Sequence, residues 1–221
     1  PKRSIGVRVP VGRPFNYLFP LGDFRVTHFQ QEWILQMPNN YLSATHNQLT
    51  DTEHRHLAQR RYDEYRKSAL IATNNSLCPT GVTATEFTNE ALIHIDNWDK
   101  YDRRDAYWDW RKVKQDHGRL YPKRFEIVLW EKDRPIGAAI GRPTYSGGKT
   151  RIDVAEGMPR EMGDRSNVIE TIIGAFEIYS ILIGATEVRI MNPVNPKVRE
   201  VYARYGYRYY DAGNYMFSEV M

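Results

Sequence analysis

Apolar and polar positions in the second half of the chain follow the pattern of short strands joined by tight turns. Apolar residues fill 125–131, and a second apolar run, 135–142, returns after the polar turn at 132–134. The Gly-rich stretch 146–149 is a further hairpin signal. Residues 150–156 then alternate, with Ile152 and Val154 on one face. The pattern predicts three antiparallel strands in a meander.

A long apolar stretch follows and predicts a helix over 167–183. Ser166 or Asn167 would cap it, with Glu170 completing a capping box, and Gly184 would end it. Residues 186–191 then read as a buried strand. Next comes a short helix capped by Asn195, with Pro196 at its first position and its end at Gly206. A hairpin of 207–210 and 214–220 closes the chain. Because a helix between parallel strands forms a right-handed crossover, this half is α/β, with a mixed sheet that starts antiparallel and has a parallel centre.

The first 121 residues are less regular. Residues 1–20 are basic and interrupted by prolines, and 24–35 reads as a strand with one aromatic face. A helix is predicted over 51–73, capped by Thr50 or Asp51; its two predicted faces carry Leu57, Tyr65 and the stem of Arg61 on one side, and Arg60, Arg66 and Lys67 on the other. A second helix is predicted over 89–115, where Trp98, Tyr101, Asp105 and Trp108 fall at helical spacing. We expect one domain over 1–221, in which 1–121 elaborates a core formed by 122–221.

Composition narrows the classes of protein. The chain has 221 residues, 41% hydrophobic and 26% charged, which is ordinary for a globular protein. Cys78 is its only cysteine, which excludes an internal disulfide and favours a reducing, cytoplasmic setting. No apolar run is long enough to cross a bilayer, and the start at 1–3 lacks the apolar core of a signal peptide. A formal charge of +4 permits an anionic partner without requiring one.

Several kinds of site are not predicted. The histidines His54, His56 and His94 have no carboxylate or cysteine at metal-ligand spacing, so no metal is expected. The chain lacks a Walker loop, a dinucleotide-binding fingerprint and a Gly-x-Ser-x-Gly elbow. These absences argue against NTPases, dehydrogenases and the common hydrolases.

The most informative motif lies near the end of the chain. Asn195 is followed seven residues later by Tyr202, and then by Gly206 and Tyr207. This spacing resembles the final motif of the GCN5-related N-acetyltransferases (GNAT), and the resemblance covers about 122–221. It implies a GNAT-like fold with a splayed parallel centre, flanked by helices, to which the helical N-terminal portion is an unusual addition. It also implies transfer of an acyl group from acetyl-CoA or another acyl-CoA to an amine.

The same resemblance implies roles for individual residues. Val154, Ala155 and Glu156 would lie at the acyl group. The residues that would hold the donor's phosphates and pantetheine arm are Gly163, Arg165, Ser166, Asn167 and Asn195. Tyr202 would act as general acid towards the leaving thiolate, and Glu156 as base, with Asp153 as the next candidate.

The phosphate loop departs from the family pattern, because Ser166 and Val168 stand where small residues are usual. That departure leaves room for a carrier-protein donor, another acyl-CoA, or a binding protein that keeps the fold without the activity.

The acceptor is left open by the sequence. Tyr107 and Trp108 belong to a stretch of alternating aromatic and basic residues, which can line a substrate groove, pack as core, or contact nucleic acid. The acceptor could be a protein, a small molecule or a nucleic acid, and a dimer is possible.

Overall fold

The computed structural model describes residues 50–101, 106–163, 165 and 167–220, with the side chains of 51 and 79 left aside. The predicted strand at 24–35 and the basic segment 1–20 lie outside the described residues, as do Asp105 and Ser166. The helices are α2 (Asp51–Leu77), α3 (Asn89–Ile95), α4 (Trp110–Leu120), α5 (Val168–Leu182) and α6 (Pro196–Arg204), and the 3-10 turns are η1 (Cys78–Thr80), η2 (Asp96–Lys100), η3 (Arg160–Met162) and η4 (Asp211–Gly213).

A seven-stranded sheet runs through the centre of the fold, in the order β1-β2-β3-β4-β5-β7-β6. Its strands are β1 (Val82–Thr85), β2 (Phe125–Glu131), β3 (Arg134–Pro143), β4 (Lys149–Gly157), β5 (Glu187–Met191), β6 (Arg208–Tyr210) and β7 (Tyr215–Glu219). Among the strands of the described residues, only the β4–β5 pair is parallel, and every other neighbouring pair is antiparallel. The prediction of a mixed α/β sheet with an antiparallel start and a parallel centre is therefore confirmed.

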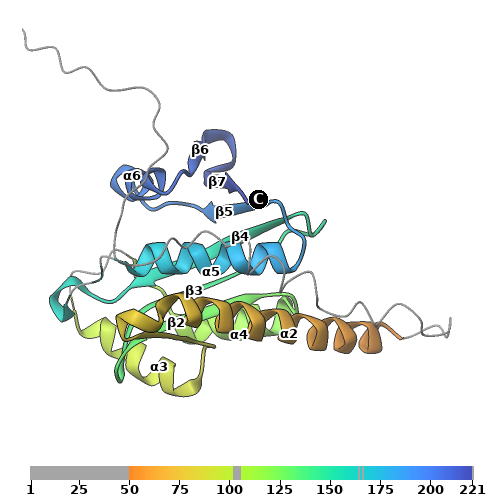
Figure 1. The fold of residues 1–221 in the computed structure, drawn as a ribbon, viewed down its shortest axis with the longest axis horizontal. Helices are drawn as coiled ribbons and strands as arrows, with labels where there is room; N and C mark the ends of the chain where they lie inside the picture. Colours follow the sequence, from red (N-terminus) through yellow and green to blue (C-terminus); the bar gives the residue numbers. More distant parts are fainter. Residues whose placement is uncertain (1–49, 102–105, 164, 166, 221) are drawn as a thin grey trace, which may run out of the picture.

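Helices cover both faces of this sheet. In Figure 1, α2 and α5 run side by side across one face, and the residues of these two helices are in contact. A Cβ added to Gly141 of β3 would meet Phe176 of α5 at 2.8 Å, so Gly141 faces α5. Glu156 of β4 contacts Trp110 of α4 instead. Since neighbouring strand residues point to opposite faces, α3 and α4 cover the other face.

Aromatic side chains pack together where α5 crosses β2. The ring of Phe125 stacks on Tyr179 at 4.7 Å and meets Phe176 edge-on at 4.9 Å. The hydroxyl of Tyr179 donates to the carbonyl of Lys123 at 2.6 Å. The prediction of an apolar helix after β4 is correct, because this helix is buried on most of its circumference.

The capping box predicted for α5 is wrong. Asn167 is the N-cap residue, but its side chain accepts no capping hydrogen bond, and its backbone is in the helical region with φ −99° and ψ 0°. An N-cap side chain reaches the backbone amides of the first helical turn when its own backbone is extended. The backbone of Asn167 is helical, so its side chain does not reach them.

The faces predicted for α2 are wrong in part, since Tyr65 packs against the core and Arg60 and Lys67 are exposed as predicted. Thr50 caps the helix through a capping box with Glu53, but Leu57 is exposed and Arg66 is buried. Arg66 lies inside because its guanidinium donates to the carbonyls of Pro122 and Arg124 at 3.2 and 3.0 Å, just before β2. The aliphatic stem of an arginine packs well when its donors find such acceptors.

The single helix predicted over 89–115 is divided in the structure. α3 ends at Ile95, the 3-10 turn η2 follows, and Tyr101 is extended. A new helix begins at Trp110, where the carboxylate of Asp109 accepts from the amide of Lys112 at 2.9 Å. Asp and Asn side chains favour turns and caps over helix interiors, which explains the interruption between α3 and α4. The helical spacing of the aromatic residues instead suggests one continuous helix.

Candidate active site

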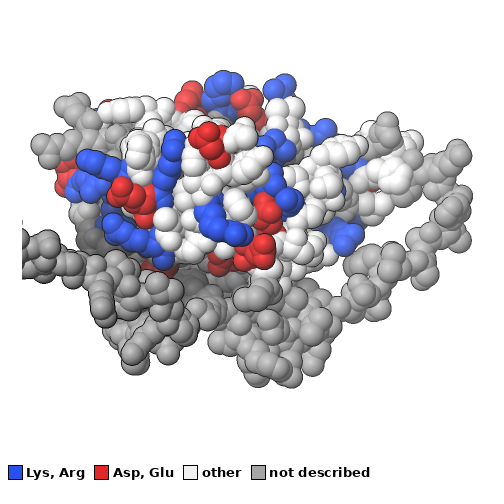
Figure 2. Space-filling view, turned by 90° about the horizontal axis from the view of Figure 1, so that it is seen from above, with Lys and Arg blue, Asp and Glu red and all other residues white. Residues whose placement is uncertain are grey.

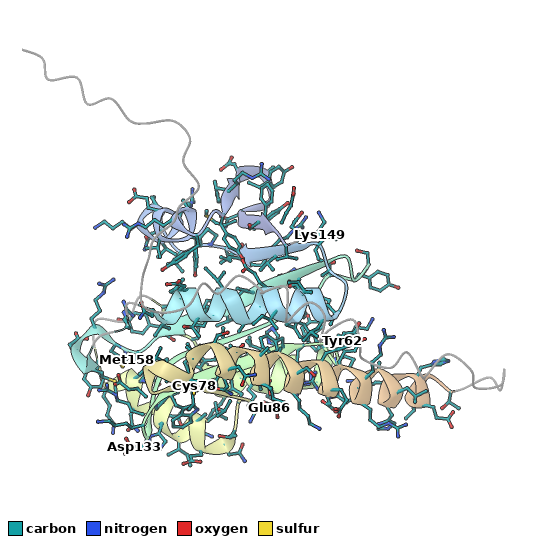
Figure 3. The ribbon with its side chains drawn as sticks, viewed as in Figure 1. Tyr62, Cys78, Glu86, Asp133, Lys149 and Met158 are labelled. Carbon is teal, nitrogen blue, oxygen red and sulfur yellow. The ribbon has the colours of Figure 1, made fainter. Side chains whose placement is uncertain are left out.

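The central strands β4 and β5 separate part-way along their length. They pair from Lys149 with Glu187 to Ile152 with Ile190, and the pairing ends there. β4 continues to Gly157 beside β3, whereas β5 ends at Met191, and Asn192 then adopts a left-handed φ of +48°. Within the described chain, the β5-facing edge of Val154, Ala155 and Glu156 therefore has no strand partner. Figure 3 labels Lys149, the first residue of β4, and Met158, the residue that follows its last.

A β-bulge lies where the separation begins. Ile140 pairs with Val154 but Gly141 pairs with Ile152, so Asp153 is the extra residue. A bulge bends its strand and increases its twist. It therefore supplies a local reason for β4 to turn away from β5.

The side chain of Asp153 is held by three cationic or polar partners. Arg151 Nε donates to it, Arg142 Nε lies 3.4 Å away, and His117 Nε2 lies 3.2 Å away. The other ring nitrogen of His117 lies 2.9 Å from the carbonyl of Val113. The bulge is thus tied to α4 and to β3 through one carboxylate.

Glu156 is buried, with 3% of its surface exposed. Trp110 Nε1 donates to its Oε2 at 2.9 Å. The family resemblance points to Glu156 but not to Trp110, which falls inside the predicted long helix. Asp109 three residues before Lys112 was the signal that could have placed Trp110 at a helix start.

Three of the residues predicted to contact the donor's phosphates lie in the segment between β4 and α5. Gly163 adopts a φ of +142°, which favours glycine, and Arg134 Nη1 donates to the neighbouring carbonyl of Met162 at 2.6 Å. Arg165 Nη1 donates to the carbonyl of Met158 at 3.0 Å, so this guanidinium binds the backbone immediately after β4. Asn167 stands at the N-terminus of α5, where unpaired backbone amides favour anions.

Tyr202, the predicted general acid, lies on α6, and Asn195, the last of the predicted donor-binding residues, caps that helix. Asn195 Oδ1 accepts from the amide of Val198 at 3.0 Å, and Pro196 is the first helical residue, both as predicted. Tyr202 is buried, and burial raises its pKa to about 12. The phenol is therefore neutral throughout the physiological pH range.

Tyr107 and Trp108 lie beside a hollow of about 410 Å³. Tyr107 is exposed and Trp108 is half-buried, and neither is in a helix. The hollow is lined by aromatic, acidic and apolar side chains and one arginine: Ile95, Asp96, Asp99, Tyr107, Trp108, Asp109, Trp110 and Arg111. Because Trp110 lines it and also contacts Glu156, the hollow adjoins the α4 side of β4.

Glu177 of α5 is a partly buried carboxyl that faces the C-terminal strands. Burial raises its pKa from the ordinary 4.5, and the hydroxyl of Tyr207, 3.3 Å away, acts in the opposite direction. Because the pKa of Glu177 is higher in the folded protein than in the unfolded chain, this group favours folding most at a pH below its unfolded-state pKa. That contribution to the free energy of unfolding is lost as the pH rises through the folded-state pKa.

We therefore expect Glu177→Gln to melt about 2–4 °C higher than the unaltered protein at pH 8, equivalent to about 1 kcal/mol. The difference should vanish near pH 4, because both side chains are then neutral. Thermal melting between pH 4 and 8 measures it, with Glu200→Gln on the exposed side of α6 as the control. A difference that does not change with pH would contradict the assignment.

The chain matches no protein-family model and no curated protein. Among solved structures, it is similar to a protein from Desulfovibrio desulfuricans assigned to the GNAT acetyltransferase family, at 13% identity over 63% of this chain and 99% of that one, with a TM-score of 0.52. It also aligns with the ribosomal-protein-S18-alanine N-acetyltransferase of Escherichia coli, at 11% identity over 63% of this chain and 94% of that one, with a TM-score of 0.49. A third similar structure is a mutant of the spermidine N-acetyltransferase of Vibrio cholerae, at 13% identity over 63% of this chain and 94% of that one, with a TM-score of 0.48.

The first of these similarities, together with the strand order and the splayed β4 and β5, establishes the class of fold. The chain has the GNAT fold. In the part of the chain that the structure describes, no helix combines the length and apolar character needed to span a membrane. Across the same residues, no three His, Cys, Asp or Glu side chains are grouped in a way that could bind a metal ion.

Proposed function

We propose that this protein transfers an acyl group from a CoA-type thioester to an amine. The observation that carries the proposal is the separation of β4 from β5 after Ile152 and Ile190, with the buried carboxylate of Glu156 on the segment left unpaired. Unpaired strand backbone binds an extended, amide-containing ligand as an added strand would. The pantetheine arm of a CoA-type donor has that chemistry.

The donor would lie between β4 and α6. The backbone of Val154 and Ala155 would pair with the pantetheine amides, with the Asn195 side chain near that arm. The phosphates would meet the N-terminus of α5, through amides near Gly163, Asn167 and Ser166, the last lying outside the described residues. Because Arg165 already donates to a carbonyl of the chain, it would contribute by its charge.

The acceptor would approach from the α4 side of β4, through the hollow that Tyr107 and Trp108 line. Aspartates and aromatic rings together suit a positively charged amine. Glu156 would take a proton from the ammonium, because only the neutral amine attacks a thioester. We favour Glu156 over Asp153 as base, since two arginines already surround the Asp153 carboxylate.

The rest of the reaction would use backbone amides and Tyr202. Attack forms the C–N bond, and amides near Val154–Glu156 would hold the oxyanion. Collapse breaks the C–S bond, and Tyr202 would donate a hydrogen bond and finally a proton to the sulfur. A phenol with a pKa of about 12 is a weaker acid than an alkyl thiol, whose pKa is about 8.5, so Tyr202 would act first by a hydrogen bond to the departing thiolate, and a proton given to the sulfur would be returned to the Tyr202 oxygen from solvent.

Surface charge gives less support to a nucleic-acid acceptor. On the face shown in Figure 2, Lys and Arg side chains are interspersed with Asp and Glu rather than gathered in one patch. Nucleic-acid interfaces present clustered positive charge. An amine on a small molecule or a protein fits the acidic hollow better.

Binding and product formation test the proposal together. Acetyl-CoA, longer acyl-CoAs or free CoA at about 100 times the dissociation constant should stabilise the protein by about 2.7 kcal/mol and raise its Tm by roughly 5–10 °C. Adenosine 3′,5′-bisphosphate, which lacks pantetheine, is the matched control ligand and should shift the Tm much less. Mass spectrometry of amine mixtures should then detect a new amide. If no CoA compound shifts the Tm and no amide forms, the proposal is wrong.

A further inference from the structure

Trp110 and Glu156 form a buried pair between α4 and β4. Each side chain has 3% of its surface exposed, and the indole N–H donates to the carboxylate at 2.9 Å. An indole nitrogen donates hydrogen bonds and does not accept them. It therefore stabilises negative charge on Glu156 and fixes the direction in which the carboxylate points.

The indole is itself held in place. Trp110 is the first residue of α4, which Asp109 caps, and its ring stacks on Phe87 at 5.2 Å with an interplanar angle of 29°. Seven residues further along α4, His117 contacts Asp153 at the bulge of β4. α4 thus contacts β4 on both sides of Val154 and Ala155, which fixes the helix beside the strand, while burial and the stack on Phe87 restrict the indole ring.

Trp110 is also one of the residues that line the hollow beside Tyr107 and Trp108. An acceptor that entered this hollow would lie on one side of Trp110, while the hydrogen bond to Glu156 is made by its N–H. One side chain therefore joins the space open to an acceptor and the carboxylate at the separated strands.

We propose that Trp110 is a positioning residue, which keeps the Glu156 carboxylate ionised and directed to receive the proton of the acceptor ammonium. This inference rests on the proposed function of Glu156 as base. A purely structural role for Trp110 would alter stability without changing how activity depends on pH.

The test is Trp110→Phe, which keeps an aromatic ring and removes the N–H. Two other buried tryptophans provide matched controls. Trp98 Nε1 has no hydrogen-bond partner among the described residues, so Trp98→Phe reproduces the loss of ring volume alone. Trp130 Nε1 donates to Thr85 Oγ1 at 2.9 Å, so Trp130→Phe reproduces the loss of an indole hydrogen bond elsewhere.

We expect kcat/KM for the acceptor to fall about tenfold in Trp110→Phe, the size expected of one hydrogen bond to a charged group. The acidic limb of its pH profile should move to higher pH, because the ionised base has lost a donor. The Tm shift caused by CoA should stay unchanged. Both control variants should keep the pH profile of the unaltered protein.

A second readout does not depend on turnover. With glutamate labelled at 13Cδ and Glu156→Gln used to assign the signal, the NMR titration of Glu156 should move to higher pH in Trp110→Phe. If the protein acylates no amine, the proposed function fails, and this titration still decides whether the indole controls the carboxylate.

If Trp110→Phe does not fold, 3-benzothienylalanine at position 110 replaces the N–H by sulfur in the same shape. An unchanged titration in either form would overturn the positioning role.

Discussion

Replacing Tyr202 with phenylalanine is expected to lower kcat about 100-fold, while the dissociation constant for free CoA changes less than twofold. The first number is the lower end of what a positioned proton donor contributes. Donor affinity should persist because the ring stays buried beside the sheet and only the hydroxyl is removed. Since the phenol has a pKa of about 12, the activity should show no alkaline limb from this group below that pH.

Steady-state kinetics and CoA-induced melting shifts on the same preparations separate the two effects. Tyr205→Phe is the control, because Tyr205 closes the same helix and is only partly buried. Its kcat should stay within about twofold of the unaltered protein. An equal loss of kcat and CoA affinity in Tyr202→Phe would instead mean that the hydroxyl serves binding, and the role in the leaving step would be abandoned.

Gly141→Ala is expected to cost about 3 kcal/mol of folding free energy and to lower the Tm by roughly 6–12 °C. A Cβ at this position would lie 2.0 Å from the carbonyl oxygen of Arg151 and 2.8 Å from the ring of Phe176. The clash falls beside the bulge, where Gly141 pairs with Ile152. The strands can relieve it only by moving β4, so the CoA-induced shift should weaken as well.

Thermal melting with and without CoA measures both consequences. Gly148→Ala is the matched control, since a Cβ there meets nothing within 4 Å and the residue lies in the neighbouring β3–β4 hairpin. Its Tm should change by less than about 1 °C. If Gly141→Ala were as stable as Gly148→Ala, close packing of β3 against the bulge could not be what shapes the separation.

The second half of the chain could be predicted closely because its signals are local. The strands at 125–131 and 187–191 agree with the prediction to within a residue, and Asn195 caps α6 as its sequence position indicated. Alternating burial along β4 follows its alternating sequence. Each of these features depends on neighbours in the chain, so the sequence carries the information directly.

Features that depend on distant partners could not be predicted in this way. Arg66 is buried because carbonyls 56 and 58 residues away accept its hydrogen bonds. β1 escaped notice because four residues with mixed burial give little periodicity. The roles assigned to Tyr202 and Glu156 stay predictions, although the structure places Glu156 on the unpaired part of β4 and Tyr202 on the helix that follows β5.

The outer edge of β1 is already occupied by a side chain of α2. The amide group of Asn74 accepts from the nitrogen of Ala84 at 2.7 Å and donates to its oxygen at 2.9 Å. In an antiparallel pair, alternate residues of an edge strand direct their N–H and C=O groups away from the partner strand. Those groups can then form hydrogen bonds with a further strand. Asn74 fills the position that such a strand would take, and β1 is only four residues long. The first edge of the sheet is therefore protected against the edge-to-edge association that leads to aggregation, and a second chain would find little backbone there to pair with.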